Sequence, residues 1–218
     1  MRCPSWIVPA RGRTARLSHS FKPGGQRRIS VGNMTDTTTL ESVLRKTGAI
    51  VAGVRPDQGQ LRTPCEDYSV DQLVHHIVSW VKVFANAGAG DPQPKDPEGQ
   101  TIDNASAEFE RAAAKAVAGY AKLDDDAPVT LSSGSMPAAA SVAMMTGEYL
   151  AHGWDLARAT GQPVEYTDAE AEAARIGLTP LLSPEYRGPG MPFGHIVEVP
   201  DDASGLDRFL GFAGRSPR

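Results

Sequence analysis

Residues 148–155 read EYLAHGWD, from Glu148 to Asp155, and the kind of fold that we expect follows from them. On a helix, residues four positions apart lie on one face, so the carboxylate of Glu148 and the imidazole of His152 point the same way. Asp155 lies within about 60° of both around the helix axis. Three ionisable side chains therefore project from one face of a single helix.

This stretch belongs to a longer helix that we expect from about Pro137 to Thr160. Pro137 suits the first turn of a helix, and Gly161 is a common stop signal. Met144 and Met145 lie on the same face as the three ionisable groups, so that face should be buried. A buried charge is costly unless it is paired or bound to a metal ion, and this face therefore predicts one or the other.

A second helix carries a further candidate ligand. Ser69 and Gln72 form a capping box, so we expect the helix to begin there. Its apolar side chains form one stripe, made of Val70, Leu73, Val74, Ile77, Val81 and Phe84. His76 lies about 100° from the centre of that stripe, at its border, whereas His75 lies about 160° away and should face solvent. His76 is therefore the histidine that can meet the first helix.

Four long amphipathic helices joined by short loops predict an antiparallel four-helix bundle of the all-α class. The other two are expected at residues 37–54 and 103–122. Shorter elements complete the chain: extended segments at residues 128–135 and 196–199, a helix at residues 168–182 and a small C-terminal helix at residues 204–212. We expect all of them to form one domain, residues 34–218.

Three side chains from two facing helices can close around one ion: His76, Glu148 and His152. Two imidazole nitrogens and a carboxylate oxygen suit zinc or another first-row divalent ion, and three protein ligands leave room for water or substrate. A metal in such an open site can lower the pKa of a bound water or thiol. The alternative is a chance pattern without a metal. For Asp155, a buried salt bridge and support of a ligating imidazole both stay open.

The first 33 residues differ in composition from the rest of the chain. They hold seven Lys and Arg residues and no acid, so the net charge of −4 minus this +7 leaves −11 on the remainder. Without periodicity, they predict a disordered basic extension, which superficially resembles an organelle transit peptide. Helix-like sequence follows Met34 at once, and we expect the natural start there.

The acidic body argues against nucleic acid or an anionic membrane as a partner, because phosphate binding needs a concentrated basic face. No run of about 18 apolar residues predicts a membrane span. Cys3 and Cys65 are too few for a disulfide framework, and Cys65 has no neighbouring base in the sequence that would make it a nucleophile. We expect a cytoplasmic protein that binds a neutral or thiol-bearing small molecule.

Several motifs resemble those of the metal-binding domain of mycothiol-dependent maleylpyruvate isomerases, a family of DinB-like four-helix bundles. They are TPCEDYSV at 63–70, LVHH at 73–76, EYLAHGWDLARATG at 148–161, VEVPDD at 197–202, LDR at 206–208 and GR at 214–215. The resemblance covers about residues 37–217. It implies a zinc-like ion bound by His76, Glu148 and His152, the set that the helical faces select.

The resemblance also implies an activity. Family members use the ion to activate a low-molecular-weight thiol for isomerisation or S-transfer, which implies mycothiol as the cosubstrate. Residues 183–218 are too few for the sterol-carrier-like C-terminal domain of the full isomerase, so we do not expect maleylpyruvate itself as the substrate. We expect an enzyme in which Asp155, the residue assigned to catalysis, orients a ligand or the bundle.

Two alternatives to a thiol-dependent enzyme stay open. One is a non-catalytic metal-binding or stress-response module, and the other is a metal-dependent hydrolase that uses bound water. A homodimer is the assembly that we consider, because related bundles can pair.

Overall fold

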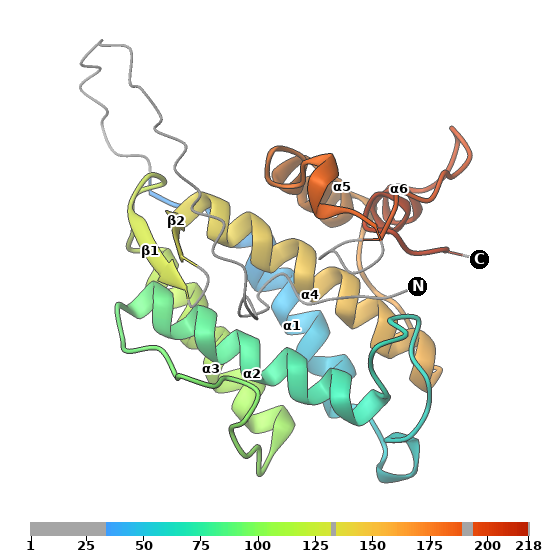
Figure 1. Ribbon diagram of the computed structural model, residues 1–218, viewed down its shortest axis with the longest axis horizontal. Coiled ribbons are helices and arrows are strands. Elements are labelled where there is room, and N and C mark those ends of the chain that lie inside the picture. Colours follow the sequence, from blue (N-terminus) through green and yellow to red (C-terminus); the bar gives the residue numbers. More distant parts are fainter. Residues whose placement is uncertain (1–33, 132–133, 189–193, 218) are drawn as a thin grey trace.

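The computed structural model describes residues 34–131, 134–188 and 194–217, and most of them are helical (Figure 1). The described helices are α1 (Thr38–Ala52), α2 (Val70–Ala89), α3 (Ala105–Tyr120), α4 (Ala138–Thr160), α5 (Asp168–Leu178) and α6 (Gly205–Phe212). The predicted all-α class is confirmed. Within the described ranges, no helix is long and apolar enough to cross a membrane. The extension predicted at residues 1–33 lies outside these ranges.

Helices α1 to α4 share one apolar core. Helix α1 packs against α3 and α4, and α2 packs against the same two helices. Each contributes fully buried side chains, for example Leu44, Phe84, Phe109 and Leu150. Burying a side chain of this size contributes about 1.5 to 3 kcal/mol, so this core is the main source of stability. Helix α5 packs on α4 and α6 on α5, on the side of α4 away from α2 and α3 (Figure 1).

Local signals set the ends of the two helices that matter most for the site. The Ser69 hydroxyl accepts a hydrogen bond from the Gln72 amide, and the Gln72 side chain accepts one from the Ser69 amide, so α2 begins with the predicted capping box. Helix α4 ends at Gly161, whose φ of +70° lies in the left-handed region that favours glycine. Pro137 precedes α4 as its N-cap and is not in its first turn.

Other predicted elements differ from the structure. The fifth helix ends at Leu178 and continues as the short 3-10 turn η2 (Thr179–Leu181), because Pro180 lacks an amide proton and disfavours α-helical geometry before it. In place of one extended segment after α3 there is an antiparallel hairpin of β1 (Pro128–Leu131) and β2 (Gly134–Pro137). Residues 196–199 form no strand.

Candidate metal centre

The three predicted ligands meet where α2 and α4 pack together. One ligand atom each of His76, Glu148 and His152 lies within 4.8 Å of the other two. The two imidazole rings approach edge to face, with centroids 5.2 Å apart. Nε2 of His152 is 3.2 Å from Oε2 of Glu148. The structure thus brings together the residues that the two helical faces point to.

The environment of Glu148 identifies the unsatisfied group in this cluster. All three side chains are buried, with exposed fractions of 4% for each histidine and 8% for Glu148. Oε1 of Glu148 is buried and has no hydrogen-bond partner among the described residues. A buried carboxylate oxygen without a partner is costly, and a cation between the carboxylate and the imidazoles would remove that cost. The donor set, two nitrogens and one oxygen, fits zinc or a related divalent ion.

A carboxylate from the loop after α2 holds His76. Oε1 of Glu98 is 2.8 Å from Nδ1 of His76 and accepts a hydrogen bond of 2.9 Å from the indole of Trp80. The hydrogen bond to His76 lowers the pKa of Glu98, and burial lowers the pKa of His76. The ring of Tyr68 stacks on His76 at 5.0 Å. With Nδ1 engaged by Glu98, Nε2 is the nitrogen available to a metal.

A second carboxylate holds His152. Oδ2 of Asp155 is 3.2 Å from Nδ1 of His152, and the same oxygen accepts a hydrogen bond of 2.9 Å from Nη2 of Arg215. Burial alone would raise the pKa of Asp155, but Arg215 and His152 bring it below its ordinary value. Burial alone would lower the pKa of His152, but its bonds to Asp155 and Glu148 raise it to about 9. A metal ion bound at Nε2 would displace the proton that this pKa implies.

Comparison with known proteins identifies the family of this chain. The sequence model of the mycothiol maleylpyruvate isomerase N-terminal domain matches residues 40–157. The chain belongs to this family. The uncharacterized proteins MT0763 and Rv0738, from two strains of Mycobacterium tuberculosis, are each 31% identical to it over 172 residues, 78% of this chain and 92% of their own length.

Two solved structures were also found. The crystal structure of the mycothiol-dependent maleylpyruvate isomerase matches at 12% identity with a TM-score of 0.48 over 68% of each chain. That of a histidine-to-alanine variant matches at 13% identity with a TM-score of 0.48 over 72% of each chain.

The residues that match the family model, 40–157, run from α1 to α4. They include His76, Glu148, His152 and Asp155. Glu98 also lies within this range. Helices α5 and α6 and the C-terminal segment follow after it.

Sequence reasoning assigned Cys65 no part in the site. Its buried sulfur belongs to a second cluster, with ligand atoms of His152 and Asp155 all within 4.8 Å of one another. The backbone carbonyl of Cys65 accepts a hydrogen bond of 2.8 Å from the Thr63 hydroxyl, which fixes this loop over the site. This cluster is less suited to a metal ion, because the guanidinium of Arg215 already supplies the positive charge beside Asp155.

Two further expectations concern single side chains, His75 and Asp155. His75, predicted to face solvent, is half-buried, and its Nε2 lies 3.0 Å from the carbonyl oxygen of Gln100. Asp155 is fully buried, and both roles left open for it are present together: it forms a salt bridge and it contacts the imidazole of His152. No short-range signal points to Glu98, which comes from a loop, and Arg215 stands in a motif of the family resemblance without a role assigned to it.

Proposed function

We propose that this chain is a metal-dependent enzyme that activates a low-molecular-weight thiol, mycothiol or a close analogue, for S-transfer to a small electrophile or for its isomerisation. His76, Glu148 and His152 bind the divalent ion, which we expect to be zinc. The observation that carries the proposal is the buried, unpaired Oε1 of Glu148 beside two imidazoles. Membership of a family named for mycothiol and maleylpyruvate isomerisation supports the thiol and the reaction class.

The chain's own residues position the ligands. Glu98 and Asp155 engage the Nδ1 atoms of the two histidines, which leaves both Nε2 atoms for the ion. The rings of Tyr68 and Trp80 lie beside His76 and exclude water from that side. A divalent ion held by three protein ligands supplies a Lewis acid that favours the thiolate form of a thiol at neutral pH.

The maleylpyruvate reaction itself is not part of the proposal. We propose instead that the substrate is another small electrophile. We also propose that residues 34–218 form the active domain and that the protein works in the cytoplasm. Binding of nucleic acid is not expected. Formation of a homodimer is a prediction that sedimentation velocity measurements can check.

The first test is elemental analysis of the purified protein and of the His152→Ala variant. We expect about one zinc ion per wild-type chain and none in the variant, with the far-UV circular dichroism of both almost equal, because the apolar core does not depend on His152. A wild-type protein without bound metal after zinc reconstitution would refute the metal centre.

The second test addresses the thiol. The zinc-loaded protein is mixed with a panel of electrophiles in the presence and absence of mycothiol, and loss of electrophile is followed by chromatography. We expect turnover that requires the thiol and that is lost in His152→Ala. Turnover without any thiol would favour the hydrolase, and a zinc protein that neither binds mycothiol nor turns over any electrophile would favour the non-catalytic module.

A further inference from the structure

The segment after α6 turns back against the protein, and its Arg215 is buried. Gly214 has a φ of +81°, and a Cβ atom there would lie 3.0 Å from the backbone of Gly194, so glycine is required at this turn. The amide of Arg215 donates a hydrogen bond of 2.8 Å to the carbonyl of Leu210 at the end of α6. This turn redirects the chain and aims the Arg215 side chain at α4.

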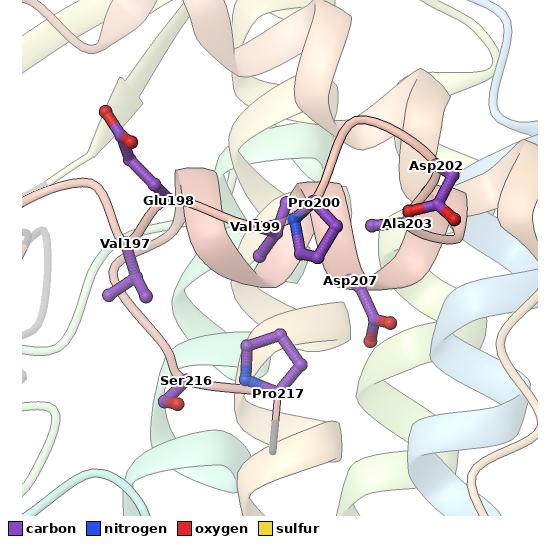
Figure 2. A pocket seen from close by; sticks show the side chains of 9 residues that line it. All are labelled: Val197, Glu198, Val199, Pro200, Asp202, Ala203, Asp207, Ser216 and Pro217. Carbon is purple, nitrogen blue, oxygen red and sulfur yellow. The ribbon is translucent and has the colours of Figure 1, made fainter.

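Ser216 is exposed and Pro217 is half-buried. Ser216 and Pro217 line a pocket of about 290 Å³ together with Val197, Glu198 and Val199 (Figure 2). The amide of Val197 donates a hydrogen bond of 2.9 Å to the carbonyl of Gly211, which attaches this segment to α6. The hydrogen bonds of Gly214 and Arg215 to Gly211 and Leu210 hold the backbone that leads into Arg215, which gives its side chain a defined direction.

The side chain of Arg215 makes a buried ion pair with Asp155. Its Nη2 lies 2.9 Å from Oδ2 and its Nε 3.5 Å from Oδ1, which approaches a two-pronged guanidinium–carboxylate pair. The side chain of Arg215 is 8% exposed and that of Asp155 is fully buried. Nη1 also donates a hydrogen bond of 2.8 Å to the carbonyl of Ala213. Breaking a buried pair by removing one partner is strongly unfavourable, so the pair fixes the position of the carboxylate.

The same carboxylate oxygen faces His152. Oδ2 of Asp155, which accepts from Arg215, is also 3.2 Å from Nδ1 of His152. The contacts therefore form a chain from the C-terminal segment through Asp155 to a proposed metal ligand. Groups that orient a ligating imidazole in this way commonly change metal affinity 10-fold to 100-fold when they are removed.

We propose that Arg215 is a positioning residue of the metal centre: by holding Asp155, it fixes the ring of His152 in the orientation that binds the ion. The proposal depends on the metal centre described under the proposed function. It makes the C-terminal segment, which lies outside the matched family domain, a part of the site.

A second ion pair provides a matched control. Nζ of Lys46 lies 2.7 Å from Oε2 of Glu170, and each side chain is 11% exposed. This pair joins α1 to α5 and makes no contact with His152 among the hydrogen bonds of the described residues. Lys46→Ala thus removes a largely buried cation from an ion pair without disturbing His152.

The test measures zinc affinity by competition with a chromophoric chelator, and the visible spectrum of the cobalt-substituted protein. We expect Arg215→Ala to weaken zinc binding about 10-fold to 100-fold and to change the cobalt spectrum. Arg215→Lys keeps the charge without the planar fork, so its affinity should lie between those of the wild type and Arg215→Ala. Lys46→Ala should match the wild type in both measurements. If the role of Arg215 is only structural, Arg215→Ala should lower the stability of the protein and leave its zinc affinity and cobalt spectrum unchanged.

Asp155→Asn completes the experiment. If Arg215 acts through Asp155, the double variant should weaken zinc binding no more than the larger of the two single changes. Should Arg215→Ala fail to fold, Arg215→Lys and Asp155→Asn carry the test. If Arg215→Ala binds zinc as tightly as the wild type, or if the effects of the two changes add, Arg215 does not position His152. Either result would leave the metal centre itself standing. A wild-type protein that binds no zinc would overturn the metal centre and this inference together.

Discussion

Oε1 of Glu98 lies 2.8 Å from Nδ1 of His76, so a loop residue supports a ligand of the proposed metal centre. Glu98→Gln keeps the shape of the side chain but removes its charge. We expect zinc affinity to fall about 10-fold, at the lower end of the range for such partners, because an amide can still accept a hydrogen bond from the imidazole. Chelator competition measures this change.

A carboxylate on α3 that pairs with a lysine of α2 provides the control for Glu98. Oε2 of Glu108 lies 2.6 Å from Nζ of Lys82 and does not contact either histidine ligand. Glu108→Gln should therefore leave zinc affinity within experimental error of the wild type. Equal losses in both variants would show that negative charge near these helices matters in general and that the contact with His76 does not.

The ion pair between Lys46 and Glu170 predicts a specific loss of stability in acid. Burial alone would raise the pKa of Glu170, but Lys46 and Ser42 bring it down to about 2 from an ordinary 4.5. A carboxyl group with a depressed pKa stabilises the fold fully above its unfolded pKa and loses that contribution as the pH falls through its folded pKa. We expect the wild type to lose about 2 to 3 kcal/mol from this group between pH 5 and pH 2.

Urea unfolding of Glu170→Gln at several pH values between 2 and 6 tests this prediction. The variant should be less stable than the wild type at pH 6, and the difference should shrink toward pH 2. Glu172→Gln is the control, since Glu172 pairs with Arg175 on a surface where each side chain is about one third exposed. Its effect should be below about 1 kcal/mol at every pH. A constant difference for Glu170→Gln would contradict the assigned pKa.

Gly153, between the proposed ligand His152 and Trp154, is expected to tolerate no side chain. A Cβ atom at this position would overlap the hydroxyl oxygen of Tyr166, which lies 2.8 Å from the hydroxyl of Thr47 inside the protein. We expect Gly153→Ala to lower the free energy of unfolding by about 1 to 3 kcal/mol, because a buried ring must move. Chemical denaturation of the metal-free protein measures it.

Tyr166→Phe distinguishes this clash from a loss of helix flexibility. It removes the hydroxyl that the new methyl group would meet, so the double variant Gly153→Ala, Tyr166→Phe should recover part of the lost stability relative to the sum of the single changes. Strict additivity would place the cause elsewhere.

The parts of the site that could be predicted depend on local geometry. Glu148 and His152 share a face because they are four residues apart on one helix, and His76 follows from its place beside an apolar stripe. The start of α2 and the end of α4 were predictable for the same reason. The capping box and the glycine stop that set them act within a few residues.

The supporting residues could not be predicted in this way. Arg215 is 60 positions from Asp155, and Glu98 is 22 positions from His76. Cys65 comes from the loop before α2 and meets His152 only because α4 packs there. Each of these contacts depends on the tertiary arrangement of loops and of the C-terminal segment, for which periodicity carries no information.

Removal of the metal should leave the helices in place while reducing stability. The shared core of α1 to α4 consists of apolar side chains that do not depend on an ion. A ligand that binds only the folded state adds about 2.7 kcal/mol when its free concentration is 100 times its dissociation constant. We therefore expect chelator-treated protein to keep its far-UV circular dichroism and to unfold at a lower urea concentration, and added zinc to restore the wild-type midpoint. His152→Ala should show the same low midpoint with and without zinc. Loss of most of the helical signal on chelation would instead assign the ion a structural role.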